Sequence, residues 1–154
     1  MKYWVRLIVA AGLLGALVGG CGTKKAESTL PVTRMQIGGE AFNLEIATRY
    51  HDQEVGLMHR DHLDADHGMI FPMPMGMQTF WNHDVHFPLD VIFLDDKENI
   101  VSVVRLEAYN EQGKSSGKPA EYAIELNAGT AERLKLKVGD HLDVPGEAVV
   151  EVGK

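Results

Sequence analysis

The chain has 154 residues, a formal net charge of −7, 45% hydrophobic residues and one cysteine. Such an acidic balance argues against nucleic acid or anionic lipid headgroups as electrostatic partners. A single cysteine excludes an intramolecular disulfide, so any domain in the chain must be stabilised by its own hydrophobic core. The length suits one domain after a short N-terminal segment.

The first twenty residues have the pattern of an export signal. Lys2 and Arg6 supply a positive start, and an apolar stretch follows from residue 7 to residue 18. This stretch is shorter than the about 20 apolar residues of a membrane-spanning helix, but it fits the about 7–15 apolar residues of a secretory signal. We therefore expect residues 1–20 to be a signal peptide.

The sequence Leu-Val-Gly-Gly-Cys at residues 17–21 resembles the bacterial lipobox. The resemblance implies that Cys21 is acylated and becomes the mature N-terminus, which would attach the protein to the membrane through lipid. Residues 21–31 are then a lipidated tether and residues 32–154 a single globular domain. Gly22, rather than Asp, after the cysteine favours the outer membrane if the source has two membranes. We expect a cell-envelope protein facing the periplasm or the exterior; the alternative is a secreted protein with an incidental cysteine.

The first part of the domain predicts a hairpin followed by a helix. Apolar residues alternate with polar ones on both sides of Gly38 and Gly39, which is a β-hairpin signal. Helical spacing follows from Thr48 to Arg60, with Thr48 as the expected N-cap. Gly56 weakens that helix and indicates close packing at its position.

Short strands are expected in the second half, with no simple assignment for residues 67–88. The continuous apolar run Leu89–Leu94 predicts a strand covered on both faces. Strands are expected at residues 100–106, 122–126, 142–144 and 148–152, a loop at 110–119 and a helical turn at 130–134. We predict an α+β, mainly β domain: a small barrel-like or rolled antiparallel sheet with one principal helix.

Three ordered stretches resemble the family known as domain of unknown function 192. The resemblance covers about residues 35–144, and the family implies a compact, mostly β fold without an established activity. Asp84 and Val85 stand where the family usually has asparagine and threonine, so any function of that pair would be altered here. The stretches are Gly56-Leu57-Met58-x-Arg60-x-x-Leu63 with Gly68-Met69-Ile70-Phe71, Phe80-Trp81 with Pro88-Leu89-Asp90-x-Ile92-Phe93, and Ile124-Glu125-Leu126-x-Ala128-Gly129-Thr130 with Val138-Gly139-Asp140.

Asp90 and Glu125 interrupt apolar strands, where alternation would point both carboxylates away from their apolar neighbours. One hypothesis makes them an acid–base pair in a cleft near Trp81, which requires a raised pKa. The alternative, which we favour, gives each carboxylate a structural ion pair, with Arg60 or Arg105 as partner.

A soft-metal site is the second hypothesis. Met73, Met75 and Met77 alternate, so one extended segment would put their thioethers on one side. Thioethers together with imidazoles favour Cu(I) or Ag(I), and Trp81 could add a cation–π contact. Methionines filling irregular core space are the alternative. The imidazoles considered are His67, His83 and His86.

A second cluster of polar residues gives a weaker metal hypothesis, and two catalytic motifs are missing from the sequence. Three histidines and three aspartates could bind Zn(II) or Ca(II), although such charged residues are more often a solvated surface. The sequence has neither a Gly-x-Ser-x-Gly motif nor a glycine-rich phosphate loop, and its one cysteine is assigned to lipid. The three histidines and three aspartates of the Zn(II) or Ca(II) hypothesis are His59, His62, His67, Asp61, Asp64 and Asp66.

These observations favour a lipid-anchored envelope domain that binds a protein or a small ligand, with no catalytic residue assigned. Soft-metal binding is the first alternative, and a small carboxylate-dependent enzyme is the second. A pocket that holds Asp90, Glu125 and Trp81 together would favour the enzyme, whereas titration with Cu(I) or Ag(I), followed by the Met methyl or Trp81 signals, tests the soft-metal site.

Overall fold

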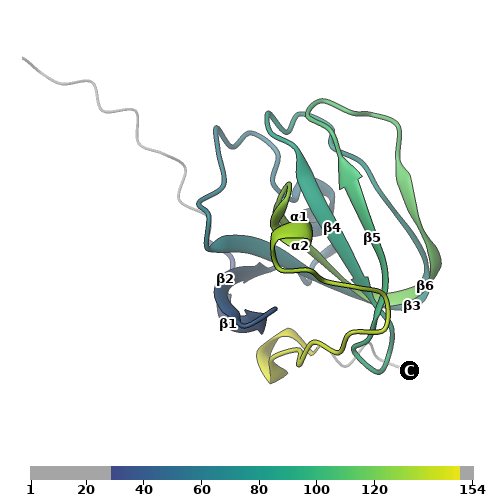
Figure 1. Cartoon of the computed structure of the whole chain (residues 1–154). Helices are drawn as coiled ribbons and strands as arrows, with labels where there is room; N and C mark the ends of the chain where they lie inside the picture. Colours follow the sequence, from purple (N-terminus) through teal and green to yellow (C-terminus); the bar gives the residue numbers. More distant parts are fainter. Residues whose placement is uncertain (1–28, 150–154) are drawn as a thin grey trace, which may run out of the picture.

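The computed structural model describes residues 29–149, which form one six-stranded sheet with short helices (Figure 1). The predicted signal peptide, Cys21 and most of the predicted tether lie outside this range, as do residues 150–154. Within residues 29–149 no helix has the length and apolar character needed to cross a membrane. The elements are β1 (Val32–Ile37), β2 (Glu40–Ile46), α1 (Tyr50–Val55), β3 (His67–Phe80), β4 (Leu89–Leu94), β5 (Ile100–Leu106), β6 (Lys114–Asn127), α2 (Thr130–Arg133) and the 3-10 turn η1 (Gly146–Ala148).

The mainly β, α+β prediction is confirmed, with two corrections to its geometry. The strand order is β1-β2-β3-β6-β4-β5, and β2 pairs with β3 in parallel while every other pairing is antiparallel. The sheet is mixed because the segment containing α1 carries the chain back before β3 begins, as parallel neighbours require. In the described residues the outer strands β1 and β5 do not pair, so the sheet stays open and no barrel closes.

The predicted hairpin is present, and the predicted helix is shorter than expected. Gly38 and Gly39 have φ of 58° and 87°, the left-handed conformation that a two-residue hairpin turn needs. Helix α1 starts at Tyr50 rather than near Thr48, and no side chain caps it. It ends at Gly56, whose φ of 49° cannot continue a helix, so the glycine terminates α1 instead of merely weakening it.

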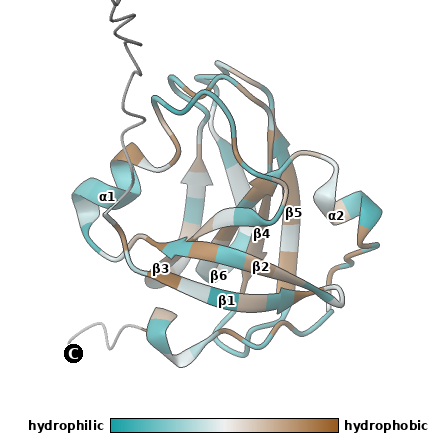
Figure 2. Ribbon diagram, turned by 90° about the vertical axis from the view of Figure 1, so that its left-hand side faces the viewer, coloured by the Kyte–Doolittle hydropathy of each residue, from teal (hydrophilic) through white to brown (hydrophobic). Residues whose placement is uncertain are grey.

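Two hydrophobic cores cover the two faces of the sheet. The first core includes Ile70, Ile92 and Ile124, and the second includes Phe71 and Phe93. Because side chains alternate along a strand, each central strand contributes to both cores. All six residues of β4 are buried, which confirms the prediction for its apolar run. Figure 2 shows α1 and α2 on opposite sides of the sheet, with α1 on the side of the second core.

The C-terminal part closes the first core without the strands predicted at residues 142–144 and 148–149. Leu142, Val144 and Ala148 are buried in that core, but apart from the bridge between Asn99 and His141 the chain forms no described strand there. Their apolar spacing reflects one-sided packing of an irregular segment. The loop predicted at 110–119 is also wrong in part, since β6 begins at residue 114 and pairs with the end of β3.

Candidate functional site

A pocket of about 180 Å³ opens on the side of the second core. It lies between α1 with the residues after it, the distal half of β3, and the loop that follows β3. Its walls are largely apolar, and Trp81 stands half-exposed at its mouth. The apolar lining includes Leu57, Phe71, Met73, Phe80, Trp81 and Val85.

Two amides hold the pocket walls in place. Gln53 of α1 donates from Nε2 to the carbonyls of Ala47 (2.9 Å) and Pro72 (2.8 Å), which docks the helix onto β3. Asn82 is almost fully buried and donates from Nδ2 to the carbonyls of Phe87 (3.0 Å) and Glu107 (2.9 Å). Its Oδ1 is buried without a hydrogen-bond partner in the described part of the chain.

The two walls are joined by His59 and Asp84. The backbone N–H of His59 donates to the Asp84 carbonyl (3.2 Å), and His59 Nδ1 lies 2.7 Å from an Asp84 carboxylate oxygen. Asp84 has a φ of 51°, a conformation that asparagine and aspartate tolerate better than most residues. Val85 packs in the second core. Asp84 therefore adopts a backbone geometry that asparagine, the residue that the family resemblance leads us to expect there, would tolerate as well.

Glu125 lies at the base of the pocket. It stands in β6 between Met69 of β3 and Val91 of β4, and it faces the second core because side chains alternate along the strand. Its exposed fraction is 5%, and no hydrogen bond from residues 29–149 reaches its carboxyl group. Burial raises the pKa of Glu125 from 4.5 to about 8, against the opposing charge of Arg60. This carboxyl group is therefore mostly neutral at neutral pH.

Arg60 is paired with Glu45 rather than with Asp90. Its Nη1 and Nη2 lie 2.5 and 2.8 Å from the two carboxylate oxygens of Glu45, a bidentate pair. Glu45, Met69 and Glu125 occupy neighbouring positions across β2, β3 and β6. Arg60 consequently lies near enough to act on Glu125 while its charge is already balanced by Glu45.

Asp90 belongs to the opposite face and has a structural role. Its Oδ2 accepts from the backbone N–H groups of Gly129 (2.8 Å) and Ala131 (3.0 Å), and its Oδ1 lies 2.9 Å from Nε of Arg105. The Asp90 carboxylate thus accepts hydrogen bonds from backbone N–H groups at the start of α2. Asp90 and Glu125 cannot act together in one cleft, because the sheet separates them. Each carboxylate does point opposite its immediate strand neighbours, as alternation predicts, but the two point to different faces, and each face is covered by a core.

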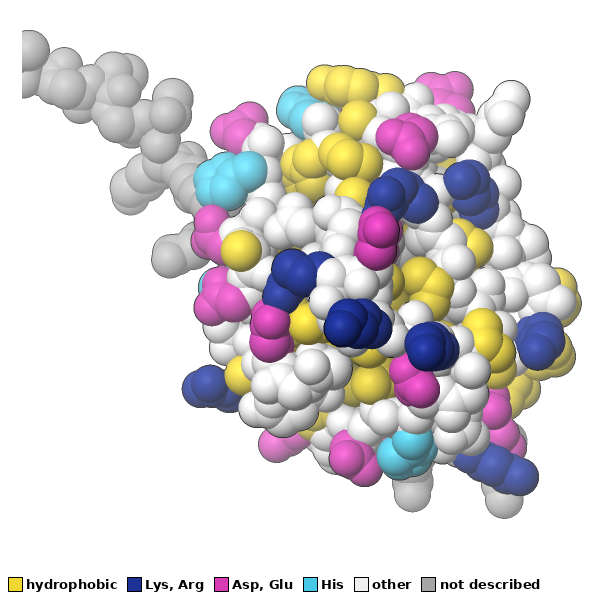
Figure 3. All heavy atoms as spheres, viewed as in Figure 1, with side chains coloured by type: hydrophobic (Ala, Val, Ile, Leu, Met, Phe, Trp, Pro, Cys, Tyr) yellow, Lys and Arg dark blue, Asp and Glu magenta, His cyan; other side chains and the backbone are white. Residues whose placement is uncertain are grey.

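The face bearing α2 and β5 has mixed charge. In the view of Figure 3, basic side chains lie interspersed with acidic ones over this face. A second hollow beside Asp90 is lined by Arg105, Glu132 and Lys135 among others. Intermixed charges of this kind are typical of a solvated surface.

The predicted soft-metal ligands do not gather at one point. Met73 is buried in the second core and lines the pocket, whereas Met75 and Met77 are exposed after a register shift in β3. His67 starts the same strand ten residues before Met77, which at about 3.3 Å per residue places it about 30 Å away. His67 therefore cannot share an ion with Met77, and a smaller site in this region stays a prediction.

His83 and His86 lie in the loop after β3 and have other neighbours. His83 Nδ1 lies 3.2 Å from a carboxylate oxygen of Glu111. The His86 ring stacks on Tyr109 with centroids 5.2 Å apart. Both histidines are exposed and are accounted for by these contacts as surface residues.

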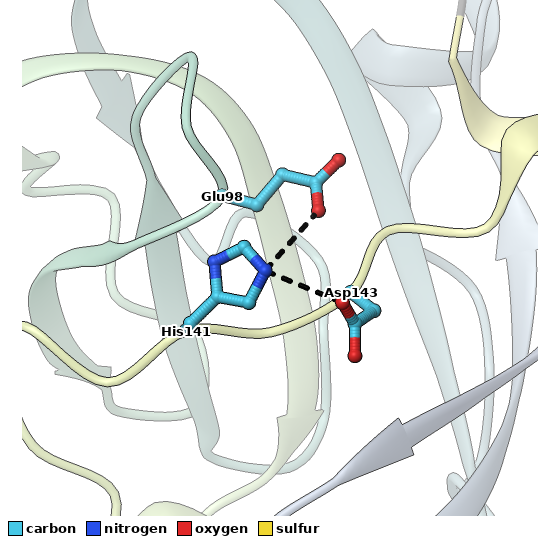
Figure 4. A group of neighbouring side chains, drawn as sticks. All are labelled: Glu98, His141 and Asp143. Atoms are coloured by element: carbon cyan, nitrogen blue, oxygen red, sulfur yellow. Dashed lines mark ion pairs between the residues drawn. The ribbon is translucent and has the colours of Figure 1, made fainter.

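The other histidine groups also form surface ion pairs. His62 and His67 each lie beside a neighbouring aspartate, Asp64 at 3.1 Å and Asp66 at 2.9 Å, so the predicted Zn(II) or Ca(II) cluster divides into separate pairs. A different group, which the sequence did not suggest, comprises Glu98, His141 and Asp143 (Figure 4).

In this group Nε2 of His141 points to both carboxylates, at 3.9 Å from Glu98 and 3.3 Å from Asp143. The backbone bridge between Asn99 and His141 brings the two segments together. The Asp143 side chain is fully exposed, so the group is explained as a solvated ion-pair cluster.

The model of the family DUF192, described as an uncharacterised ACR, matches residues 33–144. A UPF0127 protein of Pyrococcus abyssi is 31% identical over 105 residues, which cover 65% of this chain and 84% of the relative.

Two solved structures share the fold at 30% sequence identity. A protein of unknown function from Novosphingobium aromaticivorans has a TM-score of 0.72 and covers 78% of this chain and 90% of its own. A Sinorhizobium meliloti protein, described as a candidate transcription regulator, has a TM-score of 0.66 and covers 71% and 89%.

Proposed function

Because the chain belongs to the uncharacterised DUF192 family, we propose a function from its own geometry: a membrane-anchored envelope protein whose domain binds a small ligand in the pocket above Glu125. Anchoring is proposed through lipid on Cys21, as the lipobox resemblance implies. The pocket lies on the domain that follows the tether, so the protein would present a binding site at the membrane surface.

The observation that carries this proposal is the buried, unpartnered carboxyl group of Glu125 in an apolar pocket. A fully buried polar group without a hydrogen bond costs about 1–3 kcal/mol, and the 5% exposed Glu125 carboxyl group approaches that situation, so a ligand that pairs with it would recover part of this cost. Functional pockets combine apolar walls with a few convergent polar groups and a perturbed pKa. Glu125 supplies such a polar group, with Phe71 and Phe80 in the walls.

Methionine methyl groups can test ligand binding directly. Met58 and Met73 line the pocket, whereas Met35 is buried in the first core across the sheet. We expect small aromatic fragments, such as benzyl alcohol and benzylamine, to shift the methyl NMR signals of Met58 and Met73. The measurement uses the full-length chain in detergent micelles with isotope-labelled methionine, and Met35 serves as the internal reference.

Two other outcomes of this titration have a definite meaning. Unchanged Met58 and Met73 signals with every fragment would contradict the pocket as a binding site. A separate titration with Ag(I) tests the soft-metal alternative, because an ion bound by Met75 and Met77 would shift those two methyl signals and leave Met58 in place. This alternative is supported by the exposure of the Met75 and Met77 side chains, whose thioethers an added ion can reach.

Palmitate labelling tests the proposed lipid anchor on Cys21. Cells labelled with radioactive palmitate should incorporate it into the full-length chain and not into Cys21→Ala, and only the parent chain should sediment with membranes. Labelling of Cys21→Ala to the parent level would exclude this cysteine as the lipid attachment site. Trp81 fluorescence of both chains reports whether the domain itself is unchanged.

A further inference from the structure

The described residues that line the pocket include two carboxyl groups and no lysine or arginine side chain. Glu125 lies at the base of the pocket and Glu54 at its exposed rim. His83, which also lines the pocket, lies beside Glu111 at 3.2 Å. An anionic ligand would meet two carboxyl groups and no counter-charge, so this lining favours a neutral or a cationic ligand.

Aromatic residues line the same pocket as Glu125. Phe71 and Phe80 pack edge to face with centroids 5.1 Å apart, and Phe80 meets Phe93 at 5.4 Å. Trp81 stands at the mouth with about half of its surface exposed. Aromatic rings attract cations within about 6 Å of their centroids, and the attraction strengthens when water is excluded. These walls accept an apolar body and also stabilise positive charge.

Arg60, the described cation whose charge acts on Glu125, is already engaged. The guanidinium of Arg60 is bidentate to Glu45, so the Arg60–Glu45 pair is neutral as a unit. Glu125 therefore has no counter-ion of its own among the described residues. A ligand cation at the pocket base would complete this set of charges, whereas a neutral ligand would use only the apolar walls and one hydrogen bond.

We infer that the pocket selects a small organic cation, in which an ammonium group pairs with Glu125 and an apolar body about the size of one six-membered ring packs against Phe71 and Phe80. The volume of about 180 Å³ fits this size, since a protein cavity of about 150 Å³ holds benzene. This inference rests on the proposed function, that the pocket binds a small ligand, and adds the chemical class of that ligand.

Binding of a cation is linked to loss of a proton from Glu125. Burial raises the pKa of Glu125 to about 8, so pairing with an ammonium group at neutral pH displaces the proton. The affinity for a cation should then rise about tenfold per pH unit below about pH 8. A neutral ligand that accepts a hydrogen bond from protonated Glu125 has the opposite dependence. The sign of the pH dependence thus identifies the charge of the preferred ligand.

Other titratable groups face this region and need a control. They are Glu45 of β2, Tyr50 and Glu54 of α1, Arg60 after α1, and His83 after β3. An imidazole in the pocket lining needs a control of its own, because a positive charge there would also weaken binding of a cation. His83→Gln removes that contribution, and we expect the pH dependence to persist in this variant.

The experiment compares benzylamine with benzyl alcohol, which has nearly the same shape without the charge. Binding is followed by the Met58 and Met73 methyl signals of the full-length chain from about pH 6 to about pH 8, where a primary ammonium stays protonated. We expect benzylamine affinity to rise with pH and to fall at least about tenfold in Glu125→Gln at about pH 8. Benzyl alcohol should bind more weakly at that pH and be unaffected by the substitution.

Each contrary result separates this inference from the proposed function. If benzyl alcohol binds as tightly as benzylamine, or benzylamine affinity falls with rising pH, the pocket binds ligands but the cation inference is wrong. If neither compound moves Met58 or Met73, the proposed function itself fails. The unchanged Met35 signal shows that Glu125→Gln remains folded, and Glu54→Gln, at the rim, should reduce benzylamine affinity less than Glu125→Gln.

Discussion

Replacing Glu125 by glutamine should change how the stability of the domain depends on pH. The unfolded chain loses the Glu125 proton near pH 4.5, while burial delays its loss in the folded domain to about pH 8. Between these values the folded state holds one more proton than the unfolded state, so stability falls as pH rises. The contribution is fully present below about pH 4.5 and is lost by about pH 8. Glutamine stays neutral throughout and abolishes this dependence.

The size of the effect follows from the pKa values. One proton held only in the folded state changes the free energy of unfolding by about 1.4 kcal/mol per pH unit. The interval from 4.5 to about 8 then corresponds to about 4–5 kcal/mol in total. Because small domains have a total stability of about 5–15 kcal/mol, a change of this size is readily measured. Glu125→Gln should therefore be close to the parent in stability at acid pH and more stable above neutrality.

Urea unfolding at several pH values measures this difference. Trp81 fluorescence follows the transition in a Trp4→Phe background, where it is the only tryptophan of the two in the chain. Glu54→Gln, which removes an exposed carboxylate of the same pocket, should keep the parental pH dependence. Parallel curves for the parent and Glu125→Gln would show that Glu125 ionises normally in the folded domain and would refute the reasoning.

Three further substitutions test the structural assignments. Asp90→Asn should lower the melting temperature by about 5–10 °C in a thermal scan, because one acceptor is lost from the α2 N–H groups or from Arg105, and unchanged benzylamine affinity is expected. Gly68→Ala should cost about 3 kcal/mol in urea unfolding, since a Cβ would lie 2.5 Å from a backbone oxygen of β6, whereas Gly76→Ala has room and should be tolerated. Arg60→Ala should cost about 2 kcal/mol by unpairing a buried carboxylate; a neutral result would contradict the pairing.

Local features of the chain were largely predictable from the sequence. The hairpin follows from two glycines between alternating residues, and the doubly covered strand β4 follows from a continuous apolar run. Period and turn chemistry act over a few residues, which is why these elements are correct. The length of α1 was overestimated because Gly56 adopts a positive φ that its neighbours do not reveal.

The long strands β3 and β6 show where local reasoning fails. Residues 114–120 have the composition of a loop, yet they pair with the distal part of β3, whose own sequence contains two prolines. Backbone pairing between segments far apart in the chain overrides local propensity at such positions. The C-terminal segment shows the converse, since its apolar spacing serves one-sided packing on the first core and the described residues form no strand there.

The residues of the candidate site were likewise predictable only in part from the sequence. The sequence alone identified Glu125, Trp81 and Arg60 as polar or aromatic residues of interest, because a carboxylate in an apolar strand is visible as a break in the pattern. It did not indicate Gln53 or Asn82, whose role depends on carbonyl groups distant in the chain; Asn82, next to the Phe80-Trp81 motif, carried the only signal.

The sequence by itself determined the export pattern expected at Cys21, the family and the mainly β class, since each depends on residue order and spacing. Only the tertiary structure decided that Asp90 and Glu125 lie on opposite faces of the sheet and that Met73 is buried while Met77 is exposed. The pairing register assigns each side chain to a face, and register depends on hydrogen bonds between distant segments. That register places the unpaired Glu125 carboxyl group beneath an aromatic pocket.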